Sequence, residues 1–219
     1  MNILNKNRIS RRHFTKEILY KGGLLAVSGF GSCFFFKNAT AADTLQKKLS
    51  QAIDGRVITS TILLKEYSYD FGHMIRKEPR IVVVPKSRED ILKVFEIADS
   101  FGVPISIRGC GHSCIGQSLS DGGIILHNYK TTAGYSKNKD MLTVSSNTEI
   151  SLLEKSLNTH GLTNPVLPYF LDLTLGGVLS AGGVGPLSIK RGILAENINK
   201  LTLITPQGES VTCSAEKNS

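Results

Sequence analysis

The chain has 219 residues, of which 41% are hydrophobic and 20% are charged, and this composition excludes a mainly disordered protein. Its 26 Lys and Arg against 18 Asp and Glu give a formal charge of +8, which by itself would suggest nucleic acid or an acidic membrane surface as a partner. Residues 1–41, however, hold seven of the basic residues and one acidic residue, so the rest of the chain carries only +2. We therefore expect no nucleic-acid partner.

The N-terminus has the pattern of an export leader. Residues 10–16 read S-R-R-H-F-T-K, which resembles a twin-arginine signal, and an apolar stretch over 18–36 follows. Ala39-Thr40-Ala41 supplies the small residues that a signal peptidase accepts, so we expect a signal peptide over 1–41 and a periplasmic or secreted protein. A membrane anchor is the lesser alternative, because the apolar stretch carries Lys21 and barely reaches the roughly 20 residues that a span needs. Twin-arginine export carries folded proteins, usually ones that already hold a cofactor.

The remaining sequence predicts an α+β fold with no repeats. In chain order, the spacing of apolar residues and the turn signals predict helices over 43–53, 87–102 and 148–160, and strands over 81–84, 104–107, 123–126, 141–144, 200–205 and 209–213. Residues 56–80 show a weak pattern and are expected to be rich in loops. The β-branched run Ile81–Val84 predicts a strand buried on both faces, and Ser87 with Asp90 resembles a capping box at the start of the next helix.

Two glycine clusters stand out, since 11 of the 21 glycines fall within 109–123 and 176–192. Glycine permits positive φ and close backbone approach, so such clusters beside strand ends indicate a main-chain nest for phosphate, with two plain turns as the alternative. Cys114 stands where a dinucleotide fingerprint has its third glycine, and Gln117 stands where a P-loop has its lysine. Cys110, His112 and Cys114 do not have a usual zinc spacing, so no metal is expected.

The longer strings carry a specific resemblance. Residues 108–117 read R-G-C-G-H-S-C-I-G-Q and resemble the R-G-x-G-H-S-x-x-G-Q signature of the cytokinin dehydrogenase branch of the vanillyl-alcohol oxidase/PCMH flavoprotein family. Residues 173–180 (L-T-L-G-G-V-L-S) and 197–213 resemble two later blocks of that branch, in the same order. The resemblance implies a PCMH-type FAD-binding domain of two small α/β subdomains over 76–219, preceded by a lead-in segment over 42–75.

The resemblance also implies the cofactor and its ligands. FAD is expected, with a covalent bond from His112 to the 8α-methyl carbon of the flavin, and the amides of 108–113 and of a helix N-terminus near 176–180 are expected to meet its pyrophosphate. His73, His127 and His160 have no motif around them and are expected to be structural or surface residues. The expected cofactor-binding residues are Arg108, Gly109, Cys110, Gly111, His112, Ser113, Gln117, Thr174, Gly176, Gly177, Ser180 and Val184.

Two departures from the family limit the functional prediction. Cytokinin dehydrogenases have a catalytic aspartate five residues before the threonine of L-T-V-G-G, and here that place holds Tyr169, with Asp172 three residues away. A phenol is a poor general base near neutral pH, because phenols ordinarily ionise near pH 10. The family also continues beyond the segment that matches residue 213, into a substrate-binding domain, so we expect a C-terminally truncated FAD domain with an open sheet edge and exposed apolar surface.

The expected function is therefore that of an FAD-dependent oxidoreductase, in which the flavin takes a hydride from a C–N or C–OH bond of a small-molecule substrate. A carbohydrate or alcohol oxidase of the same fold is one alternative. A catalytically inactive flavin-binding fragment that needs a second polypeptide is the other.

Overall fold

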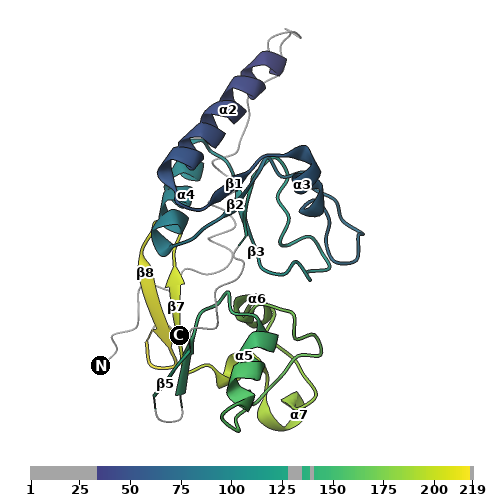
Figure 1. Cartoon of the computed structure of the whole chain (residues 1–219), viewed down its shortest axis with the longest axis vertical. Coiled ribbons are helices and arrows are strands. Elements are labelled where there is room, and N and C mark those ends of the chain that lie inside the picture. Colours follow the sequence, from purple (N-terminus) through teal and green to yellow (C-terminus); the bar gives the residue numbers. More distant parts are fainter. Residues whose placement is uncertain (1–33, 128–134, 139–140, 218–219) are drawn as a thin grey trace, which may run out of the picture. The chain divides into compact units, whose positions relative to one another are not determined.

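The computed structural model describes residues 34–127, 135–138 and 141–217 (Figure 1). Nearly all of them belong to the second of two compact units, Thr40–Ser219. The twin-arginine motif lies outside the described residues, and the predicted cleavage site after Ala41 lies within the first described helix. Among the helices that the structure describes, none is both long enough and apolar enough to cross a membrane.

The described residues form both helices and strands, grouped in runs in the second half of the chain, which confirms the α+β prediction. The helices are α2 (Phe34–Ala52), α3 (Thr61–Glu66), α4 (Arg88–Ser100), α5 (Ile150–Asn158), α6 (Leu175–Ser180), α7 (Ser188–Arg191) and the 3-10 helix η1 (Leu194–Asn197). The strands are β1 (Arg56–Ile58), β2 (Ile81–Val84), β3 (Ile105–Arg108), β4 (Ile124–His127), β5 (Tyr135–Asn138), β6 (Met141–Val144), β7 (Lys200–Ile204) and β8 (Ser210–Ser214).

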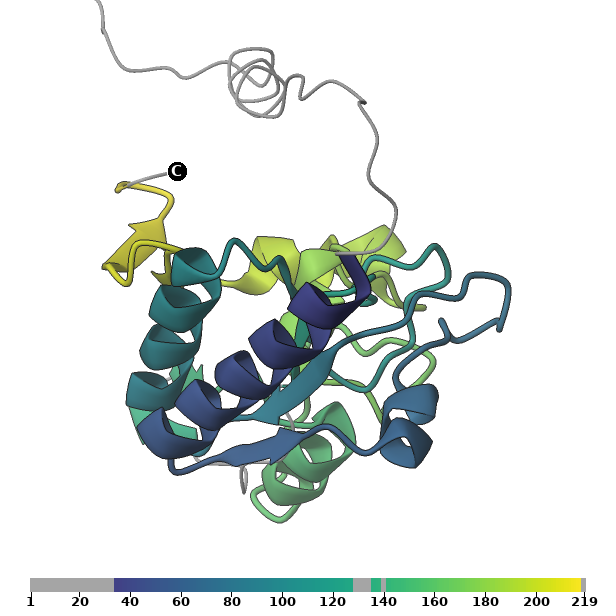
Figure 2. The ribbon, with the colours of Figure 1, turned by 90° about the horizontal axis from the view of Figure 1, so that it is seen from above.

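A four-stranded sheet with the order β1-β2-β4-β3 forms the first core. Strand β1 is antiparallel to β2, whereas β2 and β3 both pair in parallel with β4. Helices α2 and α4 cover one face of the sheet, and Figure 2 shows them along β1 and β2. Val82 on the opposite face is as fully buried as Ile81 and Val83, so the predicted burial of β2 on both faces is confirmed. The shared cluster contains Leu45, Leu49, Ile53, Ile81, Val83, Val94, Ala98, Ile124 and Leu126.

The first glycine cluster is the connection between β3 and β4. Because these neighbouring strands are parallel, the chain must return from the carboxyl end of β3 to the amino end of β4, and residues 109–123 make that crossover. Gly111 and Gly116 lie in the left-handed region, with φ of +78° and +72°. A Cβ atom at Gly123 would lie 2.5 Å from the carbonyl oxygen of Pro104. The crossover is therefore built from backbone conformations and contacts that favour glycine.

The second core joins the second glycine cluster to α5. Its buried members are Ile150, Val166, Leu175, Val178 and Leu194. Two separate antiparallel pairs, β5–β6 and β7–β8, complete the described strands. In β7, Leu201 and Leu203 lie opposite Cys213 and Val211 on one face of the pair, and these leucines are 39% and 50% exposed. This pair therefore presents apolar side chains on its surface.

The prediction of a loop-rich segment over 56–80 is wrong in part. Strand β1 and helix α3 both lie there. The weak pattern has a physical cause, because β1 is three residues long and α3 buries none of its side chains, so neither element imposes an apolar period. Strand β5, whose sequence is Y-S-K-N, was missed for a related reason, since its sequence offers no alternation of apolar residues.

The start of α4 follows the predicted cap. The Ser87 hydroxyl accepts a hydrogen bond of 3.1 Å from the amide of Asp90, as an N-cap serine should. The carboxylate of Asp90 accepts from the amides of Asp54 (3.0 Å) and Lys86 (2.8 Å). Asp90 therefore ties α4 to the turn between α2 and β1, which fixes the layer of helices against the sheet.

Candidate functional site

The two glycine clusters meet at Gly109 and Thr174. Gly109 follows β3 directly, and Thr174 caps α6 with its hydroxyl, which accepts a hydrogen bond of 3.3 Å from the amide of Gly177. A Cβ atom at Gly109 would meet the hydroxyl oxygen of Thr174, with its Cγ2 at 3.2 Å and its Cβ at 3.3 Å. Segments far apart in the sequence thus lie in contact, as a shared ligand site requires.

Shortly after Gly109 in the chain, three successive backbone amides are available as hydrogen-bond donors. In the part of the chain that the structure describes, the amides of Gly111, His112 and Ser113 donate no hydrogen bond. Gly111 has a positive φ, and a residue of that conformation among ordinary ones turns successive N–H groups toward one concave surface. Three adjacent amides without a partner can therefore bind an anion such as a phosphate.

Arg108 places a positive charge at the same loop. Its guanidinium lies over Gly111, donates a hydrogen bond of 3.2 Å to the carbonyl oxygen of Tyr69, and lies 5.7 Å from the ring centroid of Tyr67. Within the described ranges it has no carboxylate within ion-pair distance. Burial lowers the pKa of Arg108, but an arginine remains a cation at neutral pH. Its charge therefore adds to the attraction of the loop for an anion.

His112 packs against two aromatic side chains, which also contact each other. Its ring centroid lies 4.4 Å from that of Phe71, with 22° between the planes, and 5.8 Å from that of Phe170. The Nδ1 atom is buried and has no hydrogen-bond partner among the described residues. A buried polar atom that lacks a partner calls for an explanation, and a bond from Nδ1 to a ligand supplies one.

These observations test whether the loop fits the flavin cofactor that the sequence implies. The amides of Gly111, His112 and Ser113 suit a pyrophosphate, the charge of Arg108 has the right sign, and Nδ1 of His112 is an uncommitted nitrogen beside them. The side chains present therefore fit FAD.

The amides of the second glycine cluster, which were expected to bind the pyrophosphate, have other hydrogen-bond partners in the structure. The amides near the start of α6 are engaged inside the chain, because that of Leu175 donates to Thr148, that of Gly176 to Ser146 at 2.6 Å, and that of Gly177 to Thr174. These amides are therefore not available to a pyrophosphate in this structure. Gly176 instead allows close packing, since a Cβ atom there would lie 3.0 Å from Ser146.

Other predicted residues make local contacts. Gln117 is exposed, and its Oε1 accepts a hydrogen bond of 3.3 Å from the amide of Ile115. The hydroxyl of Ser180 donates to the carbonyl of Gly176 at 2.8 Å, and Val184 is 66% exposed. Cys110 is half-buried and is a thiol. The side chains of Gln117 and Ser180 thus form these hydrogen bonds with residues close to them in the sequence.

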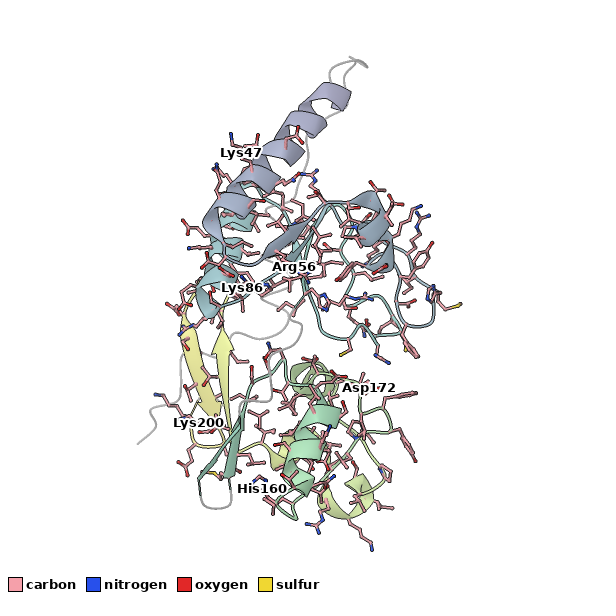
Figure 3. The ribbon with its side chains drawn as sticks, in the orientation of Figure 1. Lys47, Arg56, Lys86, His160, Asp172 and Lys200 are labelled. Carbon is pink, nitrogen blue, oxygen red and sulfur yellow. The ribbon has the colours of Figure 1, made fainter. Side chains whose placement is uncertain are left out.

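Tyr169, the residue at the position of the family's aspartate, is 84% exposed. It is adjacent in sequence to Phe170, whose ring contacts His112, so it belongs to the segment that reaches the histidine. Asp172 is also exposed, on the stretch that leads into α6 (Figure 3).

Sequence reasoning missed the residues that surround the loop. Phe71 and Phe170 contact His112, and the Tyr67 hydroxyl shares a hydrogen bond of 2.8 Å with Nδ1 of His127, which pairs in register with Arg108. None of the four lies in the motif string used to find the site. His127 was expected to be structural or on the surface, and its half-buried position with a hydrogen-bond partner agrees with a structural role.

Comparison with known proteins identifies the class. Residues 79–214 match the family described as FAD binding domain. Cytokinin dehydrogenase 10 of Oryza sativa subsp. japonica is 34% identical over 164 residues, which cover 69% of this chain and 30% of that protein. An uncharacterized oxidoreductase from the fasciation locus of Rhodococcoides fascians is 30% identical, over 74% of this chain and 37% of its own length. The chain thus spans about a third of the length of these relatives.

Solved structures agree with the sequences. The 6-hydroxy-D-nicotine oxidase of Arthrobacter nicotinovorans gives a TM-score of 0.66 at 26% identity, over 76% of this chain and 37% of that one. The Physcomitrella patens BBE-like 1 protein gives a TM-score of 0.69 at 24% identity, over 80% of this chain and 38% of that one, and shows the fold alone. The chain belongs to the FAD-binding domains of the vanillyl-alcohol oxidase/PCMH type. Its cofactor is FAD.

The contact between Gly109 and Thr174 leads to a first prediction. Gly109→Ala forces Thr174 to move, so we expect it to destabilise the chain by about 1–3 kcal/mol, as overpacking does. The double variant Gly109→Ala/Thr174→Ala no longer has the hydroxyl and Cγ2 that the new methyl group would meet. Its loss of stability should therefore be smaller than the sum of the losses of the two single variants, by at least about 0.5 kcal/mol. Urea denaturation measures both, with Gly72→Ala as the control because its nearest atom would be 3.6 Å away. Strict additivity would contradict the contact.

The half-buried His127 leads to a prediction about pH. Burial, and then the charges of Arg108 and Arg56, lower the pKa of His127 to about 4. Because histidine ordinarily titrates near 6.5, the unfolded chain binds more protons than the folded chain between pH 6.5 and 4, so stability falls as the pH falls through this window. Urea denaturation at pH 7 and at pH 5 should show a smaller loss of stability for His127→Gln than for the unmodified chain. An equal loss in both would exclude His127 as the cause.

Proposed function

We propose that the chain is the FAD-binding part of an exported oxidoreductase, in which the flavin is attached to Nδ1 of His112 and takes a hydride from a C–N or C–OH bond of a small molecule. The observation that carries the proposal is the buried Nδ1 of His112, without a hydrogen-bond partner among the described residues, beside three amides without a partner. The resemblance of residues 10–16 to a twin-arginine signal supports the placement outside the cytoplasm. The substrate-binding part would come from sequence corresponding to the rest of the longer relatives.

Each residue of the loop has a distinct task in this proposal. The amides of Gly111, His112 and Ser113 bind the pyrophosphate, and the cation of Arg108 lowers the free energy of the bound anion. Nδ1 of His112 forms a bond to the 8α carbon. The new N–C bond would replace the N–H bond of the imidazole and one C–H bond of the 8α-methyl group, and the two electrons and two protons released would reduce dioxygen to hydrogen peroxide. When bound, FAD supplies the hydride acceptor.

Covalent attachment is tested by acid precipitation. We expect the purified chain, incubated with FAD and precipitated with acid, to retain yellow colour, and the peptide that contains His112 to gain the mass of the cofactor. His112→Ala should abolish this acid-stable flavin, because it removes the nitrogen that forms the bond. Denaturing gels read by flavin fluorescence and mass spectrometry of the digested chain provide the measurements.

His160→Ala is the matched control, because His160 is an exposed histidine at the end of α5 and lies outside the loop. It should retain the acid-stable flavin fully. A colourless pellet from the unmodified chain, with no mass increase at His112, would overturn covalent attachment.

A carbohydrate or alcohol oxidase is the second candidate, and Tyr169 is the observation that favours it. The position where cytokinin dehydrogenases have their aspartate here carries an exposed tyrosine, so no carboxylate stands at that position to take a proton from an amine. Among structures of similar fold, a chitooligosaccharide oxidase gives a TM-score of 0.69 at 22% identity, over 81% of this chain and 38% of that one.

The two candidates differ in the effect of one substitution. In dye-reduction assays, Tyr169→Asp should increase amine oxidation by about 10²-fold if the general base is what the chain lacks, since a placed base contributes a factor of that order. Asp172→Asn is the control and should leave the rate unchanged. Amine oxidation by the unmodified chain at the rate of Tyr169→Asp would reject the carbohydrate or alcohol oxidase. Oxidation of oligosaccharides or alcohols by the unmodified chain would support it.

A further inference from the structure

Residues 69–76 form a closed clip around a buried carboxylate. Tyr69 and Arg76 are joined by an antiparallel bridge, and the amide of Asp70 donates to the carbonyl of Ile75 at 3.2 Å. The side chain of Asp70 is 2% exposed, and its Oδ1 accepts from the amides of Met74 (2.9 Å) and Ile75 (3.2 Å). One side chain therefore fixes the backbone of the clip from inside.

The clip is hydrogen-bonded to both ends of the motif loop, which comprises residues 108–113. At one end, the guanidinium of Arg108 donates to the carbonyl of Tyr69 at 3.2 Å. At the other end, the amide of Phe71 donates to the carbonyl of Ser113 at 3.0 Å. These two bonds flank residues 109–112, so the clip and the loop hold each other in place.

Phe71 projects from this clip onto His112. Its ring and the imidazole are nearly parallel, at 4.4 Å between centroids, whereas Phe170 lies farther away at 5.8 Å and is tilted by 42°. A stacked ring restricts rotation of the imidazole out of its plane. Since the main chain of Phe71 is bonded to the residue after His112, the stacked ring is fixed relative to the histidine backbone.

We propose that Phe71, held by the Asp70 clip, is a positioning residue for flavin attachment: it fixes the plane of the His112 imidazole so that Nδ1 meets the 8α carbon. The proposal rests on the proposed function, because it concerns the bond that His112 forms. Attachment needs the reacting atoms in a narrow range of geometry, and misplacement by about 1 Å costs of the order of 10²-fold in rate.

The test separates binding of FAD from its attachment. Phe71→Leu removes the ring and keeps an apolar side chain, Phe71→Tyr keeps the ring, and Met74→Ala is the control because Met74 is 84% exposed on the same clip. Quenching of flavin fluorescence gives the dissociation constant, and acid-stable flavin fluorescence gives the attachment rate at saturating FAD. Thermal denaturation verifies that each variant is folded.

We expect Phe71→Leu to lower the attachment rate at saturation by about 10²-fold, with the dissociation constant of FAD changed by less than about threefold. Phe71→Tyr should restore the rate to within about threefold, and Met74→Ala should match the unmodified chain. An unchanged rate in Phe71→Leu would overturn the proposal. A rate that falls only in proportion to the loss of affinity would also overturn it, because Phe71 would then act in binding.

A second measurement needs no flavin. In the NMR spectrum of the chain without cofactor, the ring protons of His112 should be shifted upfield by the stacked Phe71 and should move downfield in Phe71→Leu but not in Met74→Ala. Unchanged His112 signals in Phe71→Leu would overturn positioning by Phe71. If no chain attaches flavin while these signals move as expected, the proposed attachment fails but the control of the imidazole by Phe71 stands.

Discussion

The close approach of the Gly109 backbone to the side chain of Thr174 is the constraint on which the site depends. Gly109 continues strand β3 of one core, and Thr174 begins the helix α6 that packs in the other. A side chain at position 109 would displace Thr174, and Thr174 in turn caps α6. The sheet, the crossover loop and the second core are thus connected through a place where only hydrogen occupies the space of a side chain.

The loop that follows Gly109 combines a polar backbone that can bind an anion with an apolar environment for one side chain. The amides of Gly111, His112 and Ser113 present partial positive charge with no partner among the described residues, and Arg108 adds a full charge that no described carboxylate neutralises. On the same segment, the imidazole of His112 is covered by the rings of Phe71 and Phe170. An anion-binding backbone and an apolar enclosure for one nitrogen therefore coexist because the backbone and the side chain of His112 face different surroundings.

Local patterns predicted the elements that bury apolar side chains. The strand Ile81–Val84 and the helix capped by Ser87 were predicted because β-branched runs and caps are set by neighbouring residues. The apolar pattern over 56–80 is weak, so β1 and α3 were not predicted. A short edge strand and a helix with no buried residue follow no apolar period. The residues of the motif were chosen by their resemblance to a family signature, since clustered glycines alone fit plain turns as well as a phosphate nest.

The partners of His112 were beyond reach from the sequence. Phe71 lies about 40 residues before it and Phe170 nearly 60 after it, and neither has a pattern that distinguishes a ring packed against histidine from an ordinary apolar residue. The use of the α6 amides was also not predictable. Whether Gly176 donates to a ligand or to Ser146 depends on how closely two loops approach, which tertiary packing decides.

The crossover between β3 and β4 determines when during folding this loop acquires its shape. Parallel neighbours pair only after the intervening chain has closed, and β2, β3 and β4 bring together residues that are far apart in sequence. The motif loop belongs to the connection between β3 and β4, so its shape depends on the pairing of these two strands. When β3 and β4 are unpaired, nothing holds the two ends of this segment at a fixed separation, so the row of amides is a product of the sheet as well as of the glycines.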